Sequence, residues 1–194
     1  KNENWRFANL KKIAYENIKD AENNDEFDYE RNVSDSVSLK EGNDQIIFNN
    51  DNLVFQSQID SYLINKGFIF KPLSQALIEH GDLIHSYFMK EQPKLGSEKF
   101  YRLNQARQKE GYFVYIPEGL SIPKPIEVFN WISGKDAAIF PYSLVVSGKG
   151  SEVSVAEYVA SADDQFGLVC GVSDLIAEED SKLTYVRTQN LSEN

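Results

Sequence analysis

Apolar and polar residues alternate with a period of two in two segments of the chain, residues 145–156 and 175–186. In the first segment Val153 and Val155 share one parity, while Ser154 takes the other. This period is typical of β-strands, whose successive side chains point to opposite faces. In both segments an apolar run meets a four-residue polar turn before the alternation begins, and the two segments align at an offset of 30 residues.

Strands that recur at a fixed interval, with equivalent turns, are typical of coils stacked into a solenoid or β-helix. The pattern therefore predicts parallel strands in which Val146 stacks on Ile176 and Val155 lies next to Tyr185. A β-sandwich, whose strands alternate in the same way, is the alternative. We expect a mainly β protein whose C-terminal part is the start of a right-handed parallel β-helix.

The N-terminal part shows helical spacing of its apolar residues. One helix is predicted to begin after Asn4 and to reach residue 18. Three further helices are predicted to follow the N-caps Ser74, Asp82 and Ser97, and Gly81 separates the first two of them.

Strand and linker signals complete this part of the chain. The turn-rich run 49–52 lies between two apolar triplets, which predicts a β-hairpin. Residues 20–43 are acidic and polar, which is typical of a linker or a mobile surface segment. From Gly111 onward strand patterns take over. We therefore expect a small α+β part over residues 1–110 and a β-helical part, truncated, over residues 111–194.

Charge and composition narrow the possible partners. The 194 residues carry a formal net charge of −10, which argues against nucleic acid and against anionic membrane surfaces. No apolar run approaches the roughly 20 residues that span a bilayer, and the first residues lack the apolar core of a signal peptide. A single cysteine allows no internal disulfide, so a cytoplasmic protein is expected. The chain starts without Met and stops after a predicted strand, so we expect it to be part of a longer protein.

Gly148-Lys149-Gly150-Ser151 looks like a phosphate-binding loop at first sight. Such a loop needs four residues between its first Gly and its Gly-Lys pair, and a helix after it. Here a strand is predicted to follow, and the equivalent turn 30 residues later is acidic, with Glu178-Glu179-Asp180-Ser181. We interpret the motif as a turn.

The remaining candidates for chemistry are few. His80 and His85 lie on either side of a predicted helix break, so they do not form the i, i+4 pair of a zinc helix. Cys170 lies in an apolar run and is expected to be a small core residue; the alternative is a sulfur carrier or cluster ligand that faces the lumen. The pairs Asp163-Asp164 and Glu178-Glu179 resemble the carboxylates of a β-helical lyase or glycosidase, but they fall in predicted turns. The residues predict no catalytic, cofactor-binding or metal site, and no enzyme.

The order of several short motifs resembles the SufB/SufD family of iron–sulfur cluster assembly proteins, and its SufD branch in particular. The motif with the highest specificity is Gly111-Tyr112-Phe113-Val114-Tyr115-Ile116-Pro117, followed by Pro125-Ile126. The others are Trp5-Arg6, Gly67-Phe68-Ile69-Phe70, Leu73 to Leu77, Phe100 to Ala106, Glu157-Tyr158 and Tyr185 to Gln189. Two positions depart from the family pattern, Glu118 and Tyr142, where basic residues are common.

The resemblance implies a non-enzymatic scaffold subunit of the SUF machine, which works with a SufB-like subunit and a SufC-like ATPase. It also implies that the full complex assembles the iron–sulfur cluster, while this part of the protein holds no cofactor. The ATPase is expected to dock on the C-terminal region of the family, so this chain alone should not recruit it. The alternative function is that of a carbohydrate-active β-helix enzyme, which would show a cleft of converging carboxylates.

The predicted final strand also suggests an interaction. A β-helix that ends between coils exposes unpaired backbone groups and apolar side chains. Between Leu183 and Leu191 only Arg187 is charged, which is little protection against edge pairing. We therefore expect self-association through this strand.

Overall fold

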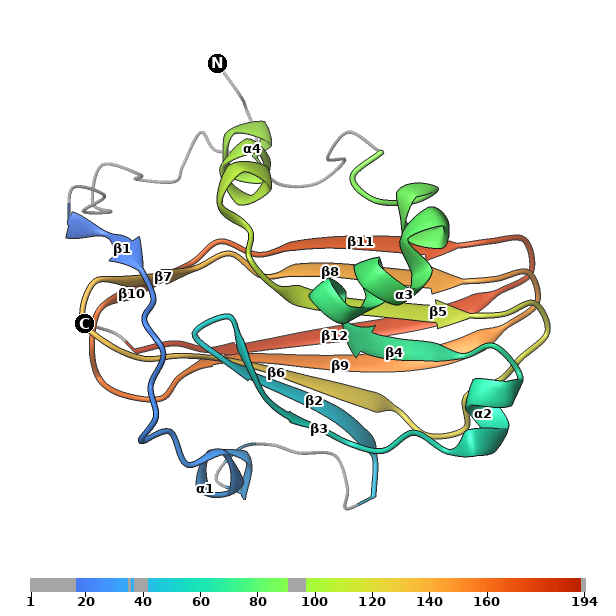
Figure 1. Cartoon of the computed structure of the whole chain (residues 1–194), viewed down its shortest axis with the longest axis horizontal. Coiled ribbons are helices and arrows are strands. Elements are labelled where there is room, and N and C mark those ends of the chain that lie inside the picture. The colour runs from blue at the N-terminus through green and yellow to red at the C-terminus, as the bar shows by residue number, and fades with distance from the viewer. Residues whose placement is uncertain (1–16, 35, 37–41, 91–96, 193–194) are drawn as a thin grey trace.

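The computed structural model describes the chain except for residues 1–16, 35, 37–41, 91–96 and 193–194. The described part is mainly β, with three sheets and short helices at the periphery (Figure 1). None of the helices in the described ranges is long and apolar enough to cross a membrane.

The C-terminal strands pass through three sheets in turn. The first sheet has the order β11-β8-β5-β4, the second β12-β9-β6-β2-β3 and the third β1-β7-β10. The strands that follow one another along the chain are β5 (Gly111–Ile116), β6 (Ile126–Ile132), β7 (Ala137–Ile139), β8 (Tyr142–Ser147), β9 (Glu152–Ser161), β10 (Gly167–Val169), β11 (Val172–Ala177) and β12 (Lys182–Asn190). We call β5–β7 the first circuit, β8–β10 the second and β11–β12 the third.

Strands of successive circuits pair in parallel and in register. Val146 is the partner of Ile176 in the first sheet, and Val155 is the partner of Tyr185 in the second. Both predicted pairs are therefore confirmed. The 30-residue offset keeps equivalent positions side by side, because the residues of β8, and those of β9 from Glu152 to Ala160, each meet the residue one repeat later.

N-terminal strands extend the same sheets. β2 (Asp44–Asn49) pairs in parallel with β6, and β3 (Asn52–Gln56) pairs antiparallel with β2. The predicted hairpin is confirmed, and its tip residues Asn50 and Asp51 take φ values of 51° and 60°, a left-handed conformation that Asn and Asp tolerate. β4 (Ile69–Pro72) pairs antiparallel with β5. Strands from both sides of residue 110 share all three sheets, and the division into parts at that residue stays a prediction.

The described residues form four helices around the sheets: α1 (Tyr29–Ser34), α2 (Ser61–Asn65), α3 (Leu73–His85) and α4 (Glu98–Arg107). α3 contains non-helical backbone angles at His80, so two helical pieces meet at a kink beside the predicted break at Gly81. Ser97 is the N-cap residue of α4, as predicted, although its side chain makes no capping hydrogen bond. Most of the helix predicted before residue 18 lies outside the described residues.

The acidic segment 20–43 is not a free linker over the part that the structure describes. Lys19 and Asp20 form β1 (Lys19–Asp20), which pairs in parallel with β7. Farther along, the ring of Phe27 lies 6.1 Å from that of Trp131, and Tyr29 stacks on Phe55 at 5.4 Å. These aromatic contacts hold the segment on the outer face of the second sheet, and the acidic composition of the segment gave no indication of them.

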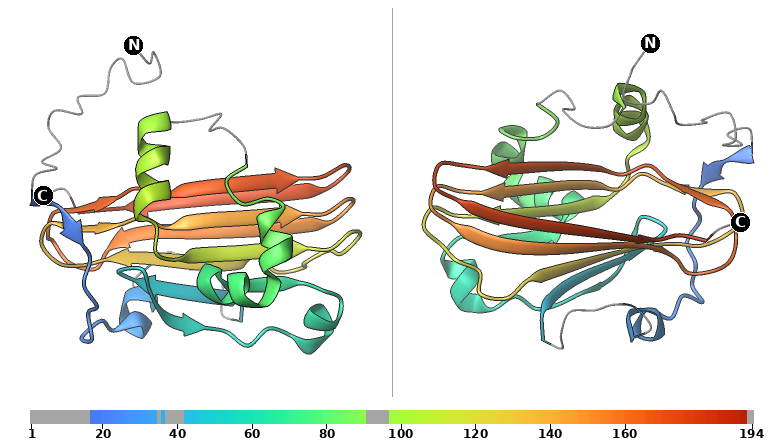
Figure 2. Two further views of the ribbon diagram at one scale, coloured as in Figure 1. Left: turned by 45° about the horizontal axis from the view of Figure 1, so that its top comes forward. Right: turned by 180° about the vertical axis from the view of Figure 1, so that it is seen from behind.

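The main core lies between the first and second sheets. Its buried side chains come from both sheets and from the N-terminal strands, and they are Ile46, Phe48, Phe68, Phe70, Tyr112, Val114, Ile116, Ile122, Ile126, Val128, Val145, Val153 and Val155. A second cluster on the outer face of the first sheet packs against α3. Figure 2 shows α3 and α4 over this face, while most of the second sheet has no helix upon it.

A buried asparagine fixes α4. The Nδ2 of Asn104, which is completely buried, donates to the carbonyl oxygens of Phe140, Pro141 and Cys170 at 3.1, 3.0 and 2.8 Å. These carbonyls belong to the corners where the chain enters β8 and β11. One side chain therefore ties α4 to two successive circuits.

Replacing Asn104 with alanine should lower the free energy of unfolding by about 1–2 kcal/mol, because the buried corner carbonyls lose their donor. Urea denaturation followed by circular dichroism would measure the loss. Arg102→Ala on the exposed side of the same helix is the matched control and should change stability little. Equal effects of the two substitutions would contradict the role given to Asn104.

Candidate functional site

A buried polar cluster surrounds Glu157. This residue of β9 is 1% exposed, and its carboxylate points into the core between the sheets. Asn130 donates to Oε1 at 2.9 Å, and Tyr112 donates to Oε2 at 3.2 Å. Ser143 lies at 3.4 Å from Oε2, and the Tyr185 hydroxyl donates to the same oxygen. The four donors come from β5, β6, β8 and β12, so they join all three circuits.

The hydroxyl donors of this cluster stay protonated. Burial, together with the charge of Glu157, raises the pKa of Tyr112 well above its usual value. The same two causes raise the pKa of Tyr185, whose hydroxyl also lies 3.1 Å from that of Ser173. Within the described chain the carboxylate of Glu157 is closed off from solvent, and its hydrogen-bond donors are side chains of the surrounding strands. The arrangement is that of a structural anchor.

A cation lies beside this cluster in the third circuit. Arg187 is the partner of Glu157 in the register of β12 and β9. Its guanidinium packs on Gly171, where a Cβ would come within 2.8 Å of Nη2. The Nε of Arg187 is inaccessible to solvent and has no hydrogen-bond partner among the described residues. Arg187 thus carries a donor that the described chain leaves unused.

Cys170 is buried, as expected, but it lies in the corner between β10 and β11 instead of within a strand. It packs with Ala138 and Phe140, and its thiol lies 3.4 Å from the carbonyl oxygen of Phe100 in α4. Burial raises the pKa of the thiol, which disfavours the reactive thiolate. Since α4 covers it from outside, Cys170 does not face the core between the sheets.

Replacing Cys170 with serine should therefore cost about 1 kcal/mol of stability and change no metal content, because a hydroxyl is less well accommodated in this apolar corner. Thermal denaturation and iron analysis of the purified chain would test both parts. Stoichiometric iron that disappears in the Cys170→Ser variant would contradict a structural role.

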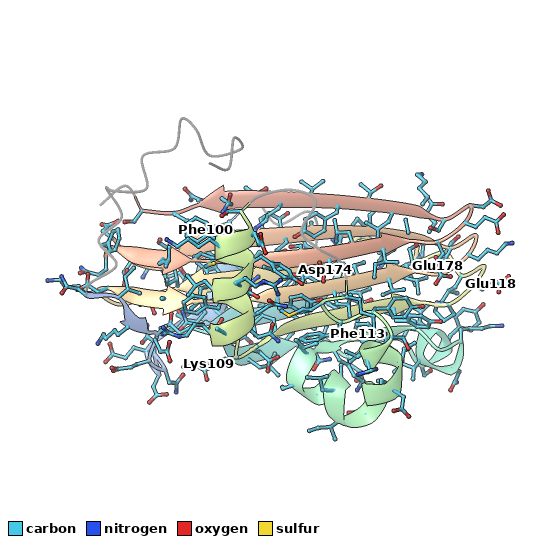
Figure 3. All side chains as sticks on the ribbon, turned by 90° about the horizontal axis from the view of Figure 1, so that it is seen from above. Phe100, Lys109, Phe113, Glu118, Asp174 and Glu178 are labelled. Atoms are coloured by element: carbon cyan, nitrogen blue, oxygen red, sulfur yellow. The ribbon has the colours of Figure 1, made fainter. Side chains whose placement is uncertain are left out.

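The glycine-rich motif forms the turn between β8 and β9, as interpreted. Gly148 packs closely, since a Cβ there would lie 2.8 Å from the carbonyl oxygen of Ile116. Lys149 forms an ion pair with Glu179 of the equivalent turn at 2.6 Å, and its backbone N–H donates to Glu178 at 3.2 Å. Glu118 and Glu178 lie at the same end of the sheets (Figure 3). The turns of the three circuits are thus stacked.

The other candidates do not come together. Asp163 lies in the turn between β9 and β10, and its carboxylate accepts the N–H groups of Gly134 and Gln165 at 2.8 and 3.0 Å. Figure 1 shows this turn at the opposite end of the sheets from the turn that holds Glu178. The two acidic pairs therefore form no common cleft.

The histidines do not mark a metal site in the described part of the chain. The Nε2 of His80 lies 3.9 Å from Oε2 of the neighbouring Glu79. The described residues hold no group of three metal-ligating side chains.

Sequence reasoning missed the interior position of Glu157. The signal was present, because Val153, Val155, Glu157 and Val159 share the parity of the inward face. A charged residue at an inward position of an alternating strand is a sign of a buried polar cluster. Its partners lie on other strands, and only the register of the three circuits brings them together.

Comparison with known proteins assigns the chain to a family. Residues 1–128 match the SufBD protein N-terminal region, and residues 130–194 match the SUF system FeS cluster assembly, SufBD core domain. Together the two family models cover nearly the whole chain. It therefore belongs to the SufBD family, as its motifs predicted.

The relatives narrow the assignment within the family. The chain is 26% identical to the iron–sulfur cluster assembly protein SufD of Bacillus subtilis, over 97% of this chain and 43% of that protein. It is 28% identical to an iron–sulfur cluster assembly SufBD family protein of Staphylococcus saprophyticus, over 73% of this chain and 30% of that protein. The chain thus spans less than half the length of these relatives, and one of them is a SufD protein that it matches over nearly its whole length.

Proposed function

We propose that this chain acts as a SufD-like, non-enzymatic scaffold in iron–sulfur cluster assembly in the cytoplasm. The observation that carries the proposal is the match of two consecutive SufBD family models from residue 1 to residue 194. The buried carboxylate of Glu157 supports it, because its hydrogen bonds hold three circuits together and leave it poorly placed for acid–base chemistry. The cluster is cargo of the assembled machine, and this chain supplies a rigid surface.

The proposal includes a fold. The three circuits would be the first coils of a right-handed parallel β-helix, supported by parallel pairing of equivalent strands in all three sheets. A β-sandwich would not stack strands at one repeated spacing, whereas here the offset is 31 residues from β5 to β8, 29 from β6 to β9 and 30 for the other stacked pairs. Cysteines introduced together at Ser154 and Thr184, which are register partners, should form a disulfide in a Cys170→Ser background. Ser154 with Thr188 is the mismatched control, and preferential cross-linking of that pair would contradict the stacking.

The partners of the proposed scaffold are a SufB-like subunit and, through the whole complex, a SufC-like ATPase. The experiment is co-expression of the tagged 194-residue chain with SufB and SufC of Bacillus subtilis, followed by affinity purification. We expect SufB to be retained, and SufC to be retained only when SufB is present. A chain that is folded by circular dichroism and binds neither subunit would overturn the proposal, and SufC binding in the absence of SufB would overturn the assigned order of contacts.

A further inference from the structure

A short segment, residues 18–24, crosses the corner of the molecule where the third sheet meets α4 (Figure 1). We call it the strap. Its strand β1 pairs with β7 over only two residues. Just before β1, Ile18 packs on the buried cluster that contains Cys170, which α4 covers from another side. The strap and α4 therefore keep the thiol of Cys170 away from solvent.

Two further sets of contacts hold the strap in place. Asp20 forms ion pairs with Arg107, the last residue of α4, and with Lys109, the latter at 3.1 Å. The carbonyl oxygen of Glu22 accepts from Nδ2 of Asn50, at the tip of the β2–β3 hairpin, at 2.7 Å. The ion pairs are partly exposed, so each stabilises the strap only slightly. The attachment of the strap therefore depends on the balance of charge around Asp20.

The other tip residue, Asp51, is part of this balance. Its Oδ2 accepts the N–H of Phe140 at 3.3 Å, and Phe140 brings no charge. The charged groups that act on Asp51 are Asp20 of the strap and, after α4, Lys109 and Glu110. Burial is the largest cause that raises the pKa of Asp51 to about 6, and the two neighbouring carboxylates raise it as well. Ionised Asp51 is thus disfavoured in the closed corner.

Ionisation of Asp51 acts on the strap through two charges. It places a second carboxylate near Asp20, and it gives Lys109 a competing partner. Both effects weaken the contact between the strap and the end of α4. Opening of the corner returns Asp51 to water, where its carboxylate ionises at a lower pH. Linkage then requires that ionised Asp51 shift the equilibrium towards the open form.

We propose that the strap is a pH-sensitive cover of this corner, and that ionisation of Asp51 raises the fraction of chains in which the strap is open and Cys170 is accessible. The circuits stay folded in the open form, because the main core between the first and second sheets contains no residue of the strap. The device does not depend on the proposed scaffold function, since all of its parts lie within the described chain.

Cys170 is the single cysteine of the chain, so its reaction with 4,4′-dithiodipyridine reports the opening. The thiolate forms a mixed disulfide with one half of the reagent and releases the other half as 4-thiopyridone, whose absorbance is measured. Dividing the rate by that of the urea-unfolded chain at the same pH removes the titration of the thiol itself. We expect the corrected rate to rise about fourfold from pH 5.5 to pH 7.5, because the pKa of Asp51 falls from about 6 to 3.8 on opening.

Substitution of Asp51 tests whether this carboxylate is the titrating group. Asp51→Asn should remove the rise, because asparagine carries no charge and tolerates the left-handed φ of 60°. Asp60→Asn, at an exposed carboxylate on the N-cap of α2, is the matched control and should keep the fourfold rise. A corrected rate that is equal at both pH values in the unsubstituted chain, or that rises as much in Asp51→Asn, would overturn the proposal.

A thiol in the main core separates local opening from unfolding of the whole chain. In a Cys170→Ser background, Val153→Cys places a thiol at a completely buried position of β9. We expect this thiol to react at least about tenfold more slowly than Cys170 at pH 7.5, because it is reached only by global unfolding. Equal corrected rates at the two positions would show that Cys170 is also reached only by global unfolding, and the strap would then not be a cover.

Discussion

Replacing Glu157 with alanine should lower the free energy of unfolding by about 3–5 kcal/mol, the largest effect that we expect from a single substitution. The physical reason is that the substitution removes the acceptor of several buried hydrogen-bond donors. Tyr112, Asn130 and Tyr185 would lose the acceptor that they share, and a buried polar group left without a partner costs about 1–3 kcal/mol. Since the donors come from all three circuits, the third circuit should also become more accessible to hydrogen exchange.

Urea denaturation followed by circular dichroism would measure this loss. Glu157→Gln should cost about 2 kcal/mol, because one amide oxygen still accepts while the new NH₂ group faces donors. Glu152→Ala is the matched control on the same strand. Its carboxylate pairs with Lys182 at 2.6 Å on the surface, and we expect a change within about 0.5 kcal/mol. If Glu157→Ala were as mild as Glu152→Ala, the interior cluster would not hold the circuits together.

The sequence predicted those features that repeat along the chain. Equal spacing of the turns placed Val146 next to Ile176 and Val155 next to Tyr185, because a constant offset between strands leaves little freedom in register. The hairpin and the break in α3 were also local signals, carried by turn residues and by a glycine. What repeats or is coded locally can be found without knowledge of tertiary contacts.

Features that depend on contacts between distant segments could not be predicted from the sequence. The acidic composition of residues 20–43 suggested a linker, yet β1 pairs with β7, and Phe27 and Tyr29 pack on the second sheet. Similarly, nothing in the α4 sequence showed that Asn104 meets three carbonyl groups more than 30 residues away. These anchors are single residues, and their partners are defined only when the circuits are stacked.

The tip of the β2–β3 hairpin should make stability depend on pH. Asp51 is largely buried there, and its Oδ2 accepts the N–H of Phe140 at 3.3 Å. Burial is the largest cause that raises the pKa of Asp51 from 3.8 to about 6, and the charges of Glu110 and Asp20 raise it as well. The Phe140 N–H and the charge of Lys109 act in the opposite direction. The folded chain therefore binds this proton more tightly than the unfolded chain, so the contribution of Asp51 to stability falls as the pH rises from about 4 through 6.

Asp51→Asn should consequently stabilise the chain by about 2 kcal/mol at pH 7.5 and by much less at pH 4.5. Asparagine tolerates the left-handed φ of 60° and keeps an oxygen that can accept the Phe140 N–H. Urea denaturation of the unsubstituted chain and of the Asp51→Asn variant at both pH values gives the stabilisation at each pH. Comparing the two stabilisations cancels the contributions of the other titrating groups. Asp60→Asn, at the exposed N-cap of α2, is the control, because its side chain accepts the Tyr62 N–H at 2.8 Å and the asparagine oxygen can accept the same bond. A gain in stability from Asp51→Asn that is the same at both pH values would show that the charge of Asp51 is not what destabilises the hairpin tip.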